Sequence, residues 1–217
     1  MTPARETETP AVIHVIDDDD AFRAAMARLL RVAGYDVKQY RSAGDYLLDP
    51  PSDGAGCLLL DLHMPGPDGL ELQEAVLRRG DSLPVIFLTG HGDIRTSVRA
   101  MRQGAADFLT KPVNREELLA AIRAALQRQE RERSSSRWRR DLAARYATLT
   151  PREKQVLEGV VTGALNKQIA ALLGTSERTV KAHRANIMQK MRVASVAELV
   201  LASAALRPRA GGAHAED

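Results

Sequence analysis

The stretch CLLLD, residues 57–61, places four apolar side chains in a row directly before a carboxylate. A second apolar run, VIFL at 85–88, ends just before Thr89. Continuous apolar runs of this length are typical of strands that are buried on both faces of a parallel sheet. A charge at the end of such a strand needs a purpose, so Asp61 is the first candidate for a functional residue.

Further apolar runs predict the rest of this sheet. The other strands are predicted at 12–16 (VIHVI), 35–39 and 108–109. Apolar residues at helical spacing predict helices at 22–32, 68–78, 93–102 and 114–126. Alternating strands and helices indicate βαβ units with right-handed crossovers. We therefore expect residues 11–126 to form a doubly wound α/β domain with a five-stranded parallel sheet.

The chain changes character after residue 126. The segment QRQERERSSSRWRR, residues 127–140, is strongly charged and almost free of apolar side chains. It predicts a linker over 127–147, helical as the continuation of the helix that begins at 114. The single tryptophan, Trp138, lies in this segment, where a partly buried aromatic in a solvated linker is the favoured interpretation.

Beyond the linker the pattern is purely helical. Thr150, Pro151 and Glu153 form a helix start, with a capping threonine, a proline at the first helical position and a glutamate that completes a capping box. Four short helices are predicted at 151–162, 166–173, 176–191 and 195–205. A tight turn at Gly174-Thr175 separates the second from the third, which predicts an all-α helix-turn-helix domain over 148–206.

The net charge divides along the same line. The chain of 217 residues has a formal charge of +3, but residues 1–125 hold 14 Lys and Arg against 19 Asp and Glu, a net of −5. Residues 126–217 hold 17 against 9, a net of +8. Such asymmetry indicates two modules with different partners, an acidic one suited to cations and a basic one suited to nucleic acid. A chance drift of surface charge is the alternative.

The composition also excludes several classes of protein. Cys57 is the only cysteine, so no internal disulfide can form, and a reducing compartment fits best. No apolar stretch approaches the roughly 20 residues needed to cross a bilayer. The segment MTPARETETP at the start has no apolar signal core. We expect a cytoplasmic protein that does not associate with membranes.

Chemically active residues are predicted to meet at one edge of the sheet. In doubly wound sheets, ligands bind beyond the carboxyl ends of the strands. The first predicted strand is followed by aspartates 17–20, the third by Asp61, the fourth by Thr89 and the fifth by Lys111. Taken singly, an aspartate run can cap a helix, a threonine can end a strand and a lysine can be solvated. Their joint placement at successive strand ends favours a functional site.

The chemistry of these groups is consistent with phosphoryl transfer. Clustered carboxylates repel one another and favour a hard dication such as Mg²⁺. A carboxylate can also attack phosphorus to give an aspartyl phosphate, and a lysine can neutralise the phosphoryl oxygens. A hydroxyl at Thr89 can hydrogen-bond the bound group.

Residues 11–126 resemble the receiver domain of bacterial two-component response regulators. The motifs that carry the resemblance are VIDDD (15–19), LLLDLHMPGPDGL (58–70), FLTGHGD (87–93) and GAADFLTKP (104–112). The resemblance implies a flavodoxin-like fold with strand order 2-1-3-4-5. It also implies that Asp61 is the phosphoacceptor and that a sensor histidine kinase is the donor.

Further site residues follow from the same resemblance. It implies that Asp17, Asp18 and Asp61 bind Mg²⁺ and that Lys111 contacts the phosphoryl group. It implies that Thr89 is a switch hydroxyl and that Phe108 is a switch aromatic, for which simple core packing is the alternative. A cis peptide bond is expected between Lys111 and Pro112.

The third helix of the basic module has two distinct faces. Val180, Ile187 and Met191 define a buried stripe. The opposite face presents Arg178, Lys181, Ala182, Ala185 and Gln189, with Arg184 and Lys190 beside it. Small and basic side chains suit the major groove of DNA, and a solvated basic helix is the alternative.

Residues 148–204 resemble the DNA-binding domain of the LuxR/NarL class, on the run LTPREKQVLEGVVTGALNKQIAALLGTSERTVKAHRANIMQKM at 149–191. The resemblance implies that 176–191 is the recognition helix. It implies that Lys181, Ala182 and Ala185 face bases. It also implies that the DNA backbone phosphates are contacted by Asn166, Lys167, Ser176, Thr179 and Arg184. With the receiver-like half in front, the whole chain resembles FixJ-like regulators.

These features predict a transcription factor that is switched by phosphorylation. The expected partners are a sensor histidine kinase, promoter DNA and RNA polymerase, with homodimerisation after phosphorylation of Asp61. The protein is not expected to be an enzyme beyond its own phosphotransfer and slow autodephosphorylation. One alternative is an aspartyl-phosphate hydrolase that uses His63, two residues beyond the nucleophile, although no substrate-capping insertion is present. Another is an adaptor that binds protein rather than DNA.

Overall fold

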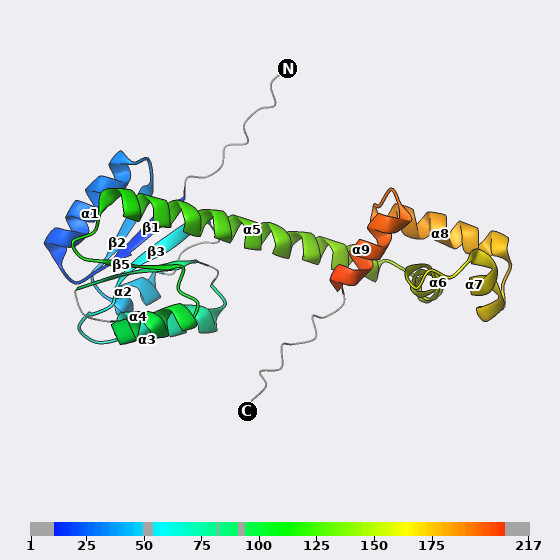
Figure 1. Cartoon of the computed structure of the whole chain (residues 1–217), viewed down its shortest axis with the longest axis horizontal. Coiled ribbons are helices and arrows are strands. Elements are labelled where there is room, and N and C mark those ends of the chain that lie inside the picture. The colour runs from blue at the N-terminus through cyan, green and yellow to red at the C-terminus, as the bar shows by residue number, and fades with distance from the viewer. Residues whose placement is uncertain (1–10, 50–53, 82, 91–93, 207–217) are drawn as a thin grey trace, which may run out of the picture. The chain divides into compact units, whose positions relative to one another are not determined.

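The computed structural model describes residues 11–49, 54–81, 83–90 and 94–206 (Figure 1). The described residues form two compact units, which divide between residues 132 and 133. The boundary between them falls inside one long helix, α5 (Arg115–Ala147).

The first unit contains an all-parallel sheet with the order β2-β1-β3-β4-β5. Its strands are β1 (Val12–Ile16), β2 (Asp36–Tyr40), β3 (Gly56–Asp61), β4 (Val85–Thr89) and β5 (Asp107–Thr110). The predicted strands and strand order are confirmed, with β2 shifted by one residue. Asp61 and Thr89, predicted to follow their strands, are instead the last strand residues. Asp61 still pairs with Leu88 in the sheet register, and Thr89 pairs with Thr110.

The helices of this unit are α1 (Asp20–Val32), α2 (Ala43–Leu48), α3 (Gly69–Arg79), α4 (Ile94–Arg102) and the start of α5. Helix α2 was not predicted. It is short and contains Gly44, so its sequence has little helical signal. Tertiary burial stabilises it, because Ala43 and Tyr46 are fully buried, and the Ser42 side chain caps it by accepting from the Asp45 amide at 3.1 Å.

The two faces of the sheet bury separate apolar clusters, which explains the continuous apolar runs. Leu58 and Leu60 of β3 pack on one face with residues of α2, α3 and α4. Cys57 and Leu59 point to the other face and pack with residues of α1 and α5. Successive side chains of a strand alternate between faces, so a strand covered on both sides needs apolar residues at every position.

The second unit is helical. The last turns of α5 are followed by α6 (Pro151–Val161), α7 (Asn166–Leu172), α8 (Glu177–Met191) and α9 (Val196–Leu206). The predicted capping box is present: the Glu153 amide donates to the Thr150 hydroxyl at 3.2 Å, and the Thr150 amide donates to the Glu153 carboxylate at 2.8 Å. The predicted stripe of Val180, Ile187 and Met191 is fully buried.

The linker predicted over 127–147 lies within α5. Gln129 of this helix is buried, and its side-chain oxygen accepts from the Gly56 amide at 3.1 Å. The helix thus remains attached to the sheet of the first unit beyond residue 126. In the part of the chain that the structure describes, every helix is too short or too polar to cross a membrane.

Candidate functional site

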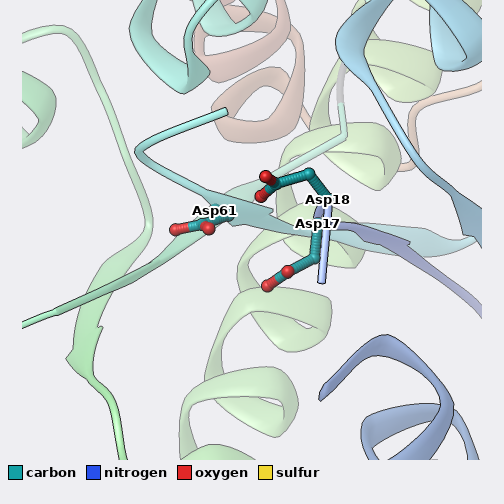
Figure 2. A group of neighbouring side chains, drawn as sticks. All are labelled: Asp17, Asp18 and Asp61. Carbon is teal, nitrogen blue, oxygen red and sulfur yellow. The ribbon is translucent and has the colours of Figure 1, made fainter. Parts of the chain in front are cut away.

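Three carboxylates meet at the carboxyl end of the sheet. Asp17 and Asp18 follow β1, and Asp61 ends the neighbouring strand β3, so the parallel pairing of the two strands brings them to one edge (Figure 2). One oxygen from each carboxylate lies within 4.8 Å of the others. Asp17 is fully buried and Asp61 nearly so, whereas Asp18 is exposed. The cluster is therefore anchored in the core and accessible from the side of Asp18.

Lys111, predicted to join this cluster, lies between two of its carboxylates. Its ammonium is 2.7 Å from Asp17 Oδ2 and 3.1 Å from Asp61 Oδ2. The same Nζ lies 4.2 Å from the centre of the Phe22 ring, which restrains it from a third side. The peptide bond between Lys111 and Pro112 is cis, as predicted.

The surroundings change the protonation behaviour of this ion pair. Burial raises the pKa of Asp17, and the hydrogen bond from Lys111 opposes that rise only in part. Burial alone would lower the pKa of Lys111, but its hydrogen bonds to Asp17 and Asp61 outweigh burial and raise the pKa. Lys111 therefore remains a cation at neutral pH, next to the oxygen atoms of Asp61.

The four aspartates of the run 17–20 have different tasks. Asp19 is the N-cap of α1 and accepts from the amides of Ala21 and Phe22 at 2.9 and 3.1 Å. Asp19 therefore has the capping role that an aspartate run can play, whereas Asp17 and Asp18 belong to the carboxylate cluster. The capping hydrogen bonds lower the pKa of Asp19, as expected for a carboxylate at a helix N-terminus.

Arg23 holds the loop between β1 and α1, and sequence reasoning missed it. Only 8% of Arg23 is exposed. Its Nη1 donates to the Asp17 carbonyl oxygen at 2.6 Å, and its Nη2 pairs with Asp20. The only signal in the sequence was the three-residue spacing from Asp20, which is common on solvated helix surfaces.

Gly69 was also missed as part of the site. It begins α3, and a Cβ atom there would lie 2.5 Å from the Asp61 carbonyl oxygen and 3.0 Å from the Phe87 ring. Both neighbours are in the buried core, so a larger residue would displace the strand end that carries Asp61. The close approach of α3 to this strand end therefore requires glycine.

Thr89 and Phe108 lie on the neighbouring strands β4 and β5. Thr89 is 1% exposed, and its hydroxyl has no hydrogen-bond partner among the described residues. Phe108 is partly buried and packs near Phe87, with 6.4 Å between the ring centres. The predicted motif at 87–93 continues into residues 91–93, which lie outside the described part of the chain. His63 is exposed, and its amide donates to Asp61 Oδ1 at 3.4 Å.

The second unit presents the other predicted site residues. Lys181, Ala182 and Ala185 are exposed on α8, and Lys167 is exposed at the start of α7. Arg184 is half-buried and donates to Asn166 Oδ1 at 2.7 Å, which fastens α8 to the first turn of α7.

The start of α8 is also well ordered by its own side chains. The Ser176 hydroxyl accepts from the Thr179 amide at 3.1 Å and lies 2.9 Å from the Thr179 hydroxyl. Both residues are exposed, so these hydroxyls stand at the surface beside the exposed face of α8.

Lys190, which the helical pattern placed beside the exposed face, turns inward instead. Its ammonium lies 2.7 Å from Glu153 Oε2 and 3.4 Å from the Thr148 carbonyl oxygen. Burial would raise the pKa of Glu153, but the hydrogen bonds from Lys190 and Thr150 lower it. Lys190 therefore links α8 to α6.

Comparisons with known proteins agree with this architecture. Residues 13–123 match the family model "Response regulator receiver domain", and residues 147–203 match "Bacterial regulatory proteins, luxR family". The response regulator protein TodT of Pseudomonas putida is 45% identical over 194 residues, 89% of this chain and 86% of TodT. The transcriptional regulatory protein FixJ of Azorhizobium caulinodans is 46% identical over 188 residues, 87% of this chain and 89% of FixJ.

Two solved structures cover most of the chain. The response regulator StyR is 42% identical, with a TM-score of 0.81 over 90% of this chain and 99% of StyR. Full-length FixJ from B. japonicum is 40% identical, with a TM-score of 0.57 over 91% of this chain and 98% of FixJ. The chain therefore belongs to the two-component response regulators and joins a receiver domain to a LuxR-type DNA-binding domain that regulates transcription.

Proposed function

We propose that Asp61 accepts a phosphoryl group from a sensor histidine kinase and that this modification controls promoter binding by the second unit. The placement of Lys111 carries the proposal, because its ammonium lies 3.1 Å from the Asp61 carboxylate that would be modified. In this proposal residues 11–126 act as the receiver, 127–147 as the linker and 148–206 as the DNA-binding domain.

The carboxylate cluster fits Mg²⁺. Its donors are all oxygen atoms, as a hard dication prefers, and the exposed Asp18 leaves a route to solvent. Asp17, Asp18 and Asp61 would hold the ion. When bound, it would offset the charge of a phosphoryl group beside the three carboxylates.

The chemical step needs little from the protein beyond position and charge. An oxygen of Asp61 attacks phosphorus, the bond from phosphorus to the kinase histidine nitrogen breaks, and that nitrogen keeps the electron pair. Lys111 stabilises the phosphoryl oxygens, and the buried Asp17 holds Lys111 in place. The product is an aspartyl phosphate on Asp61.

Thr89 and Phe108 would report the modification. A buried hydroxyl without a partner is costly, and a phosphoryl oxygen on Asp61 would offer it an acceptor. Movement of Thr89 would change the packing of Phe108 and reorganise the surface around residues 93–109. We propose that this surface then supports homodimerisation.

In the second unit, the exposed face of α8 would enter the major groove. Lys181, Ala182 and Ala185 would face the bases. The residues proposed to contact phosphates are Asn166, Lys167, Ser176, Thr179 and Arg184. A dimer would bind paired half-sites more tightly by effective concentration, and the bound dimer would then act on RNA polymerase.

The phosphoacceptor is tested with the variant Asp61→Asn, incubated with acetyl phosphate and Mg²⁺ and analysed by intact mass spectrometry. We expect phosphorylation of the wild type and of the control Asp36→Asn, an exposed aspartate at the start of β2, but not of Asp61→Asn. Continued phosphorylation of Asp61→Asn would contradict the assignment. Repeated turnover of a phosphomonoester by the wild type would instead favour a hydrolase.

A further inference from the structure

The segment RWRR, residues 137–140, is a basic surface of α5 that the helix-turn-helix does not include. All four residues are exposed, and Trp138, the only tryptophan of the chain, is 50% exposed. Within the described ranges, Arg137, Arg139 and Arg140 have no hydrogen-bond or ion-pair partner. Among these described residues, the unpaired guanidinium groups of Arg137 and Arg140 stand on one side of the helix, whereas Arg139 projects away from Arg137.

The next arginine of the same helix shows the opposite behaviour. Arg145 pairs with Asp141 and donates to the Met191 carbonyl oxygen at 3.2 Å, at the end of α8. Leu142, which lies between Asp141 and Arg145 in the chain, is buried in the apolar cluster of the second unit. These contacts fix the last turns of α5 to the same unit as α8, so the segment is part of the DNA-binding unit rather than a loose tether.

The charge of the segment requires an explanation. Residues 137–140 hold three arginines and no acidic residue, and the aspartate that follows, Asp141, pairs with Arg145. Arg137 and Arg140 are three positions apart and thus lie on one side of the helix, where like charges repel. A polyanion would relieve this repulsion, and guanidinium groups bind phosphate oxygens in two-pronged contacts.

We propose that the RWRR segment binds the DNA backbone as a second contact site of the second unit, outside the helix-turn-helix. The proposal rests on the proposed DNA binding of the second unit. The partner is duplex DNA because the segment belongs to the unit that carries α8. Its arginines would contact phosphates, which adds affinity without sequence preference.

The test compares the full-length wild type with the variant R137Q/R139Q/R140Q. Binding to a fluorescent random-sequence duplex is measured by anisotropy over a series of KCl concentrations. Each lost phosphate contact lowers the slope of log K against log salt by about 0.9, so the loss of Arg137 and Arg140 should lower the slope by about 1 to 2. Glutamine retains helix propensity, and circular dichroism checks that α5 is intact.

A matched control separates local contacts from overall charge. The variant R28Q/R31Q/R41Q removes the same charge from exposed arginines of the first unit, and its slope should stay near that of the wild type. Trp138 gives a second measurement, because its fluorescence should change when duplex is added to the wild type and stay unchanged with poly-glutamate.

Three outcomes would contradict either the proposed role of the RWRR segment or the proposed DNA binding of the second unit. If both triple variants bind with equal slopes, the RWRR segment does not contact DNA. If only poly-glutamate changes the Trp138 emission, an acidic protein is the partner instead. If the wild type treated with acetyl phosphate and Mg²⁺ binds neither the random-sequence duplex nor a selected promoter duplex, the proposed DNA binding itself fails, which distinguishes that failure from the first two.

Discussion

Arg23 shows how a single buried side chain can organise the carboxylate site without touching a ligand. It donates to the Asp17 carbonyl and pairs with Asp20, so it fixes the loop from which Asp17 and Asp18 project. Bonds from a charged donor are stronger than those between neutral groups. The loop geometry therefore depends on this guanidinium.

We predict that Arg23→Ala destabilises the fold by about 1–3 kcal/mol and slows phosphorylation by acetyl phosphate, because the buried Asp17 carbonyl loses its donor. Arg28→Ala is the matched control, since Arg28 is an exposed arginine on the same helix. Urea unfolding and phosphorylation time courses measure the two effects. Equal behaviour of the two variants would show that Arg23 has no organising role.

His14 is buried in the sheet next to two tyrosine rings. Its Nδ1 lies 3.2 Å from the Tyr40 hydroxyl, and its ring packs edge-on against Tyr46. Burial, assisted by the charge of Lys38, lowers the pKa of His14 from 6.5 to about 4. The folded protein therefore holds this imidazole neutral at a pH where the unfolded chain would protonate it.

The lowered pKa of His14 determines the direction in which stability changes with pH. Between about pH 6.5 and pH 4, His14 is protonated in the unfolded chain but not in the folded protein. The free energy of unfolding therefore decreases as the pH is lowered through this range. We expect a loss on the order of 2 kcal/mol between pH 7 and pH 5. In His14→Gln this loss should be smaller, as measured by urea unfolding at both pH values. If His14→Gln loses as much stability between pH 7 and pH 5 as the wild type does, other titratable groups account for the loss.

At the scale of elements, α6 and α8 are joined by one ion pair that also serves a helix cap. Glu153 accepts from the Thr150 amide and from Lys190 with the same oxygen. The carboxylate is nearly buried, and its pKa is lowered by these bonds despite burial. The Glu153 carboxylate thus contributes its full stabilisation at pH values above the pKa of an ordinary glutamate. This contribution is lost as the pH falls through the lower pKa that Glu153 has in the folded protein.

We predict that Glu153→Gln destabilises the second unit by about 1–2 kcal/mol at pH 7, because Lys190 loses its charged partner. The difference from wild type should shrink in acid. Glu158→Gln, a change in the same helix outside the capping box, is the control. Thermal unfolding by circular dichroism from pH 7 down to pH 3 decides between them, and a difference that stays constant over this range would contradict the ion-pair explanation.

Two features show where the local sequence pattern did not predict the structure. Helix α2 has a weak helical pattern, and the burial of Tyr46 rather than propensity stabilises it. Lys190 lies beside the exposed face by helical spacing, yet its long side chain turns back to Glu153. In both cases a partner that is distant in sequence decides the outcome, and no local window contains that partner.

At the scale of the whole molecule, the proposed switch couples the first unit to DNA. We predict that acetyl phosphate and Mg²⁺ convert the wild type to a dimer and raise its affinity for a selected promoter duplex by at least roughly tenfold, as avidity allows. Analytical ultracentrifugation and anisotropy measure the two changes. If Asp61→Asn responds in the same way, the coupling does not pass through Asp61.

Much of this architecture was predictable from the residues alone. The runs at 57–60 and 85–88 predicted doubly buried strands, because a strand between two helical layers needs apolar side chains on both faces. Thr150 and Glu153 marked a helix start, because a capping box has a fixed spacing. Asp17, Asp61, Thr89 and Lys111 stood at predicted strand ends, and parallel strands bring those ends together.

The sequence by itself determined the elements other than α2, their order in the chain and the chemical types at the strand ends, because strand and helix periodicities are local properties. Only the tertiary structure decided that Lys111 contacts Asp17 at 2.7 Å, although 94 residues separate them, and that Arg23 turns inward to the Asp17 carbonyl. Such contacts depend on how strands pair and helices pack. Lys111 and Asp17 have no local relation, and the six-residue spacing of Arg23 from Asp17 does not by itself turn the side chain inward, so both contacts exist only once the sheet and its helices have assembled.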